Sequence, residues 1–403
     1  MPVSPLTTPM PAISRRRAVV LVAALCCAIG AAIPWPGAAT ADIRTGPIGG
    51  SLMGTTGEVH ASNSAPPPAM DASAYVVADA TTGNVLAAKQ PHWRNEPASI
   101  LKTLLTLTIV RNVPLDKQVV VNAADLNVEC TCVGLTPGRS YTVDALLHAL
   151  LMRSGNDVAN VLAEATGSRA KTLQLMNATA ASLGAYDINA LTPNGLNTPG
   201  QAVSAYDMAL VLRAGLADPR FLQYFSSTTF SFGPVGGPSR PLESQNELWH
   251  LGFSGEIGAK NGWTTPAGHT FAAAAQRGGR TLIVTMLNDD HPAGADAAAL
   301  LNWGFGLSAS AGAVGSLVPA PADVAQAQQA RAAANAAKAN TIQQHANAQT
   351  TPGRPTKTPP PGSNVSVQSG FSLGAVGLAG IALLPGRRRP KKRRRNSRPT
   401  RER

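Results

Sequence analysis

The sequence predicts an α/β fold in which one antiparallel sheet, built from both ends of a domain, is flanked by a mainly helical region. Two observations support this expectation. Short apolar segments bounded by turn residues occur at 74–88 and again at 269–287, as is typical of β-hairpins. Between them, residues 142–230 are mainly helical, with apolar side chains at three- and four-residue spacing. Because the strand-rich segments enclose the helical block, the simplest fold joins them in one sheet.

The N-terminal segments are set apart by composition. Residues 1–41 have the basic flank Arg15–Arg17, an apolar stretch at 18–33 and the small-residue site Ala39-Thr40-Ala41, which together indicate a secretory signal peptide. An uncleaved membrane anchor is the alternative. Residues 42–70 are rich in Gly, Ser, Pro and Ala, so we expect a flexible leader there.

The predicted domain covers residues 71–306 and begins with strands. Residues 74–78 and 84–88 flank a polar turn at 79–83, which predicts a β-hairpin. The apolar run 103–110 has Leu, Ile and Val on nearly every side of a helix, so we expect this helix to be buried.

Two further helices are predicted at 142–152 and 157–165. They are separated by the polar break Arg153-Ser154-Gly155-Asn156, for which helix capping is a structural explanation. The domain then returns to strands, with a Gly-Gly turn joining 269–276 to 281–287, and a closing helix is predicted at 297–305.

The cysteines and histidines do not form a metal-binding pattern. Cys130 and Cys132 are one residue apart, and both a local disulfide and two free thiols remain open. No further cysteine or histidine stands near them at metal-site spacing, and the seven histidines of the chain are scattered singly. We therefore expect neither a metal nor another cofactor.

The C-terminal region predicts a tethered domain. Residues 307–368 are rich in Ala, Gln, Asn, Thr and Pro and are interpreted as a linker, and residues 369–386 as a transmembrane anchor. Residues 387–403 carry eleven Lys or Arg and one Glu, the basic flank expected on the cytoplasmic side. The net charge of the chain is +12; without this tail (+10) and Arg15–Arg17 (+3), residues 42–386 carry about −1. A nucleic-acid role would therefore depend on the tail alone, and none is expected.

A serine and a lysine stand at the head of the buried helix. At a spacing of three residues, Ser99 and Lys102 lie on one helix face. A buried lysine tends to lose its proton, and a neutral amine beside a hydroxyl can activate it as a nucleophile. The spacing alone is weak evidence, because Ser168 and Lys171 repeat it at what looks like an ordinary solvated helix start.

Two further polar groups strengthen the pattern. In chain order, Ser99-x-x-Lys102 is followed by Ser154-Gly155-Asn156 between two helices and by Lys260-Asn261-Gly262 at the end of a strand. Lys-x-Gly occurs nowhere else in the chain. The same set is found in β-lactamases and penicillin-binding proteins. The chain resembles the low-molecular-mass penicillin-binding proteins, specifically the serine D-alanyl-D-alanine carboxypeptidases, over about residues 70–305. Other segments that look like family segments are Pro193-Asn194-Gly195-Leu196, Thr265-Pro266-Ala267-Gly268 and Asn302-Trp303-Gly304-Phe305.

This resemblance implies a DD-peptidase/β-lactamase-like fold and an acyl-enzyme mechanism. Neutral Lys102 would take the proton from Ser99, which attacks the carbonyl between the two terminal D-alanines of a peptidoglycan stem peptide. The backbone N–H groups of Ser99 and Trp263 would form the oxyanion hole. Ser154 would relay a proton to the leaving D-alanine, and Asn156 would position Lys102. β-Lactams would enter the same route and inhibit the enzyme.

The resemblance also implies how the peptide is held. Lys260 would attract the terminal carboxylate and lower the pKa of Lys102, while Gly262 leaves room for the peptide to pair with the strand. One residue departs from the family, which usually has Thr where Asn261 stands; an amide can still donate to the carboxylate.

Other functions remain open at this stage. A serine β-lactamase shares the three motifs but usually has Asp where Gly155 stands. A D,D-endopeptidase can hardly be distinguished from a carboxypeptidase by sequence. A non-enzymatic alternative is an inactive wall-binding scaffold, against which the intact Ser99 and Lys102 argue.

Overall fold

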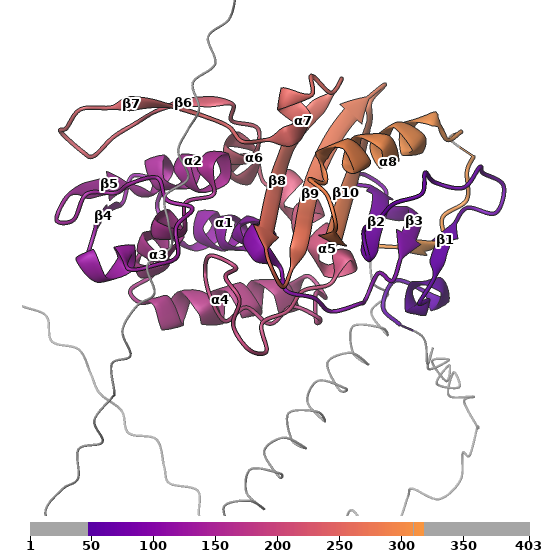
Figure 1. The fold of residues 1–403 in the computed structure, drawn as a ribbon, viewed down its shortest axis with the longest axis horizontal. Coiled ribbons are helices and arrows are strands. Elements are labelled where there is room, and N and C mark those ends of the chain that lie inside the picture. The colour runs from indigo at the N-terminus through magenta and orange to yellow at the C-terminus, as the bar shows by residue number, and fades with distance from the viewer. Residues whose placement is uncertain (1–46, 309, 318–403) are drawn as a thin grey trace, which may run out of the picture. The chain divides into compact units, whose positions relative to one another are not determined.

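The computed structural model describes residues 47–308 and 310–317. Its central element is a seven-stranded antiparallel sheet in the order β1-β3-β2-β10-β9-β8, with β11 also paired to β3 (Figure 1). The strands are β1 (Glu58–His60), β2 (Ala74–Asp79), β3 (Asn84–Lys89), β8 (Glu256–Thr264), β9 (Gly268–Arg277), β10 (Arg280–Asp289) and β11 (Gly315–Ser316). The two strand-rich ends of the domain meet where Val284 of β10 pairs with Val77 of β2. The predicted antiparallel sheet built from both ends is confirmed.

The helical region lies between β3 and β8 in the chain and beside β8 in space (Figure 1). The predicted helix after Ser99 is α1, and the two predicted helices around the Ser-Gly-Asn break are α2 and α3. The helices of this region are α1 (Leu101–Asn112), α2 (Val143–Arg153), α3 (Asn156–Glu164), α4 (Arg169–Ser182), α5 (Ala205–Leu216) and α6 (Pro219–Phe225). Two small hairpins extend it, β4 (Gln118–Val120) with β5 (Ser140–Thr142) and β6 (Thr229–Phe232) with β7 (Arg240–Glu243).

Both faces of the sheet are covered by helices. Successive residues of β2 point to opposite faces, so Val76 packs into the core shared with α1 and α5. Val77 instead packs with Leu300 and Leu301 of α8 (Gly294–Gly306), the predicted closing helix. Every residue of β2 is therefore buried. A short helix, α7 (Glu247–His250), lies beside β8.

Two expectations about the domain's ends are corrected by the structure. Residues 47–60, expected to belong to a flexible leader, contain the 3₁₀ turn η1 (Ser51–Gly54) and β1, and Met53 is fully buried. Residues 314–317, expected to belong to the linker, include β11, and the backbone N–H of Leu317 donates to the Gly83 carbonyl at 2.7 Å. β1 and β11 both pair with β3 through backbone hydrogen bonds. Such bonds need no apolar side chains, so the amino-acid composition of these segments does not reveal the strands.

The other predicted segments lie outside the described residues. These are the signal peptide at 1–41, the transmembrane anchor at 369–386 and the basic tail at 387–403. Among the helices of the described part, none combines the length and the apolar character needed to cross a bilayer.

Candidate active site

Ser99 and Lys102 lie where the sheet meets the helical region. Ser99 is in the 3₁₀ turn η2 (Ala98–Ile100), which runs directly into α1, and Lys102 is the second residue of α1. This turn is tightly held. Ala98 has a positive φ of 46°, and a side chain at Gly195 would lie 1.8 Å from the Ala98 carbonyl oxygen. Thr270 of β9 donates to the Pro97 carbonyl at 2.9 Å. Contacts from two distant segments therefore position the turn that carries Ser99.

The amine of Lys102 is the centre of the site. Its Nζ lies 2.7 Å from Ser99 Oγ, 2.8 Å from Asn156 Oδ1, 2.8 Å from the Asn194 carbonyl oxygen and 3.5 Å from Ser154 Oγ. The side chain is completely buried, and all four neighbouring oxygens are uncharged. Burial, together with the nearby charge of Lys260, lowers the pKa of Lys102 well below its usual range, although Asp157 opposes this effect.

This geometry suits an uncharged amine. A neutral amine has two N–H donors and one lone pair. The carbonyl oxygens of Asn156 and Asn194 can only accept, so they take both donors. The lone pair is then left for Ser99, whose hydroxyl can donate. The lowered pKa selects this form over an ammonium group, which would donate to all three oxygens.

Ser154 and Asn156 reach the amine from the break between α2 and α3. Ser154 ends α2 in the left-handed conformation, with φ of 60°, and Asn156 begins α3. At Gly155, an added Cβ would lie 2.8 Å from Asp157 Oδ1 and 2.8 Å from each of Val133 Cγ2 and Val158 Cγ2. The helix capping expected for this segment is found only at α2, which Ser154 ends; α3 begins after Gly155 without a side-chain cap. The break also brings two polar side chains to Lys102.

The predicted Lys-x-Gly segment lies within β8, the edge strand of the sheet (Figure 1), and not at a strand end as expected, because β8 continues to Thr264. This strand contacts η2. Lys260 is buried, and burial lowers its pKa to about 7 against the raising effect of Glu247. Its Nζ donates to the backbone oxygen of Asn261 and, at 3.3 Å, to Asn261 Oδ1. A Cβ at Gly262 would lie only 2.5 Å from the backbone nitrogen of Ser99. The backbone of β8 therefore packs directly against Ser99, and the next side chain, Trp263, is 59% exposed.

The Ser168-x-x-Lys171 repeat has an ordinary structural role. Ser168 is the N-cap of α4, and its side chain accepts from the backbone N–H of Lys171 at 3.1 Å. Lys171 is exposed. The solvated helix start expected from the sequence is confirmed.

Several groups at the site were not predicted. The Asn194 carbonyl contacts Lys102, although Asn194 had been noted only as part of a family-like segment. Glu247 of α7 accepts from Asn261 Nδ2 at 3.1 Å and from the Gly294 N–H at 2.8 Å, so it ties the Lys-x-Gly segment to α8. Cys130 and Cys132, left open by the sequence, form a disulfide. Every residue has a backbone carbonyl, so the Asn194 contact could not be predicted from residue type. An acidic residue at a helix start, such as Glu247, cannot be told apart by sequence from an ordinary helix-capping residue.

Among the described residues, one group has the residue types of a metal site, but its histidine already has hydrogen-bond partners. His92, Asp187 and Asp207 present ligand atoms within 4.8 Å of one another. Both ring nitrogens of His92 already have partners, Asp187 Oδ2 at 2.7 Å and the Ile48 carbonyl at 2.9 Å. The cluster therefore ties the N-terminal segment to the domain.

A sheet edge, a buried lysine and three converging polar motifs thus form one candidate site for serine acyl transfer. Residues 61–291, more than half of the chain, match the peptidase S11 family, described as D-alanyl-D-alanine carboxypeptidase. The chain belongs to this family.

Individual relatives agree with this assignment. The D-alanyl-D-alanine carboxypeptidase DacB2 of Mycobacterium tuberculosis is 41% identical over 267 residues, which cover 64% of this chain and 91% of that protein. DacA of Escherichia coli is 29% identical over 253 residues, covering 59% of this chain and 62% of that protein.

Solved structures show the same fold. A crystal structure of a D-alanyl-D-alanine carboxypeptidase from M. tuberculosis has a TM-score of 0.61 at 40% identity, covering 64% of this chain and 99% of that one. A mutant of the Streptomyces K15 DD-transpeptidase has a TM-score of 0.57 at 25% identity, covering 60% of this chain and all of that one.

Proposed function

We propose that this protein is a serine D-alanyl-D-alanine carboxypeptidase that removes the terminal D-alanine from peptidoglycan stem peptides. One observation carries the proposal: a fully buried lysine amine, surrounded by uncharged oxygens, lies 2.7 Å from the hydroxyl of a serine in the turn that starts α1. Family membership and the names of the relatives support the substrate class.

Acylation follows from the positions of these groups. Lys102 takes the proton from Ser99 Oγ as the oxygen attacks the carbonyl carbon of the penultimate D-alanine. The backbone N–H groups of Ser99 and Trp263 stabilise the negative charge on the carbonyl oxygen. Ser154, 3.5 Å from the lysine, passes the proton to the leaving D-alanine nitrogen, and the peptide bond breaks. Asn156 holds the lysine and binds the acyl-side amide.

The substrate is held at β8. As an edge strand, β8 can accept an extended peptide as an additional strand, and Gly262 allows this backbone to approach Ser99 closely. The terminal carboxylate lies near Lys260 and the amide of Asn261, which replaces the threonine usual in the family. Binding a carboxylate favours the charged form of Lys260, whose pKa burial has lowered to about 7.

Deacylation uses the same groups in reverse. Water, activated by Lys102, hydrolyses the ester on Ser99 and releases the shortened peptide. A β-lactam acylates Ser99 by ring opening, and its tethered leaving group remains in place, so the acyl-enzyme persists. This makes β-lactams inhibitors and useful probes.

The packing at Gly155 leaves no room for the Asp that serine β-lactamases usually carry at this position. Any side chain there would lie 2.8 Å from Asp157 and from two valine methyl groups. The close fit of α3 in this chain thus depends on glycine.

We further propose that the domain is exported and held at the outer face of the cytoplasmic membrane. The support is the sequence pattern: a signal-like segment at 1–41, an apolar run at 369–386 and a basic tail at 387–403. Alkaline extraction of membranes tests it; the full chain is expected to stay in the membrane pellet, and a chain truncated after residue 368 is expected to be released.

The catalytic proposal is tested with the purified full chain, a fluorescent penicillin and a pentapeptide ending in D-Ala-D-Ala. We expect covalent labelling and D-alanine release, both abolished by Ser99→Ala. The matched control is Ser168→Ala, which removes the other Ser-x-x-Lys hydroxyl; it weakens the α4 cap by about 1 kcal/mol but keeps activity. Labelling that persists in Ser99→Ala would overturn the assignment of the nucleophile. Labelling without D-alanine release would overturn the carboxypeptidase activity.

A further inference from the structure

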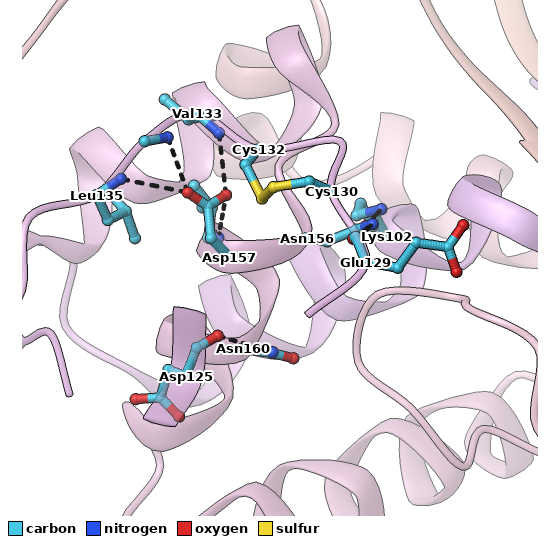
Figure 2. Close-up of a disulfide and its surroundings, with 12 residues drawn as sticks. Lys102, Asp125, Glu129, Cys130, Cys132, Val133, Leu135, Asn156, Asp157 and Asn160 are labelled. Atoms are coloured by element: carbon cyan, nitrogen blue, oxygen red, sulfur yellow. Dashed lines mark hydrogen bonds between the residues drawn. A yellow bond between two sulfur atoms is a disulfide. The ribbon is translucent and has the colours of Figure 1, made fainter. Parts of the chain in front are cut away.

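A disulfide-closed segment packs along the Ser-Gly-Asn motif. Residues 129–135 run beside Asn156 and Asp157, and the Cys130–Cys132 disulfide lies in the first part of this segment (Figure 2). Residues 129–132 are all exposed, so no buried side chain anchors this part of the chain. The disulfide itself is accessible to a solution thiol.

Two hydrogen bonds connect this exposed segment to Asn156. The Asn156 side-chain Nδ2 donates to the Glu129 carbonyl at 2.7 Å, and its backbone N–H donates to the Thr131 carbonyl at 2.7 Å. These two carbonyls are on either side of Cys130. Because Nδ2 is held by Glu129, the other amide atom, Oδ1, must point the opposite way, and it lies 2.8 Å from Lys102 Nζ. The Glu129 carbonyl thus determines which end of the amide Lys102 meets.

The far end of the segment is held separately. The buried carboxylate of Asp157 accepts from the backbone N–H groups of Val133 at 3.0 Å, Gly134 at 2.9 Å and Leu135 at 3.2 Å (Figure 2). Cys132 directly precedes this anchored stretch. The disulfide therefore links the exposed residues whose carbonyls orient Asn156 to a part of the chain that the buried Asp157 side chain holds in place.

We propose that the Cys130–Cys132 disulfide is a positioning clamp for Asn156, and that its reduction by a thiol slows acylation of Ser99. The inference rests on the proposed function. In the reduction, two thiol molecules supply two electrons and two protons; the Cys130–Cys132 bond breaks, two cysteine thiols form, and the reductant becomes a disulfide. The released segment then no longer holds the Glu129 and Thr131 carbonyls against Asn156, and the amide can rotate away from Lys102.

Loss of the clamp has a signature that general destabilisation lacks. Asn156 Oδ1 accepts from Lys102 and so favours its charged form; without this acceptor the pKa of Lys102 falls further. The charged groups acting on Lys102, Lys260 from β8 and Asp157 from α3, are held by contacts outside the disulfide. We therefore expect a lower maximal acylation rate together with an acid limb displaced to lower pH.

The experiment compares oxidised and dithiothreitol-reduced full chain under saturating fluorescent penicillin, with the two thiols verified by alkylation and mass spectrometry. We expect reduction to slow acylation about tenfold, less than the ~10²-fold that a 1 Å misplacement can cause. Reoxidation is expected to restore the rate. The matched control is the double variant Cys130→Ser, Cys132→Ser, which retains Cys26 and Cys27; it is expected to be slow and insensitive to dithiothreitol.

Each alternative outcome is decisive. An unchanged rate in the verified reduced protein would overturn the clamp while leaving the proposed function intact. The clamp would also be overturned if dithiothreitol slowed acylation in the double variant as well. It would equally be overturned if the reduced protein showed no cooperative thermal transition. Absence of labelling in every form would overturn the proposed function and the clamp with it.

Discussion

Replacing Gly262 by alanine tests the close contact between β8 and the nucleophile. The new Cβ would lie 2.5 Å from the Ser99 backbone nitrogen, 2.6 Å from Thr270 Oγ1 and 3.0 Å from Ala98 Cβ. Ordinary contact begins at 3.4 Å, so the strand and the η2 turn must separate by about 0.9 Å. Because the nearest atom belongs to the backbone, no side-chain rotation relieves the contact.

The expected effect is mainly on catalysis. A displacement of nearly 1 Å between the nucleophile and the strand that holds the substrate should slow penicillin acylation of Ser99 roughly 10²-fold. Stopped-flow or quenched labelling with a fluorescent penicillin measures this rate. The matched control is Gly306→Ala at the end of α8, where an added Cβ meets nothing within 4 Å and which should acylate normally. A Gly262→Ala rate within threefold of the wild-type rate would refute the packing described here.

Three further predictions concern residues around the site and the domain edge. Glu247→Ala should raise KM for the pentapeptide about tenfold with little change in kcat. Asn261 loses its carboxylate partner, and Lys260 loses the anion that favours its protonated form. A change confined to kcat would contradict this prediction. Gly155→Ala should lower the free energy of unfolding by ~1–3 kcal/mol in urea titrations through overcrowding, and a neutral result would contradict the packing. At His92, burial lowers the pKa but the Asp187 carboxylate outweighs it, so the net pKa is raised. The protonated form therefore stabilises the fold below the unfolded pKa, and this contribution fades as pH rises through the folded value. His92→Gln should accordingly destabilise more at pH 5.5 than at pH 8.5; equal losses would contradict the ion pair.

The predictable parts of this protein are those in which side-chain type determines structure. The apolar run after Ser99 forms the buried helix α1, and the apolar strands at both ends form one sheet, because continuous apolar segments reflect burial on all sides. Two of the three polar motifs stand at helix ends, and the third lies within β8, beside the turn that carries Ser99.

The parts that could not be predicted depend on the backbone. Asn194 and Glu129 contact the site through their carbonyl groups, which every residue possesses. The strands β1 and β11 complete an edge by main-chain pairing in segments whose composition suggested flexibility. The disulfide could not be predicted because the spacing of Cys130 and Cys132 permits it without requiring it.

The pH dependence of Ser99 acylation tests most directly whether Lys102 acts as a neutral base. With saturating fluorescent penicillin, the rate should be nearly constant over the alkaline range just below pH 10.5, because burial lowers the pKa of the lysine amine well below this value. A lysine that kept its usual pKa of 10.5 would instead make the rate climb about tenfold per pH unit. A plateau supports the neutral-amine mechanism, and a steady climb would contradict it.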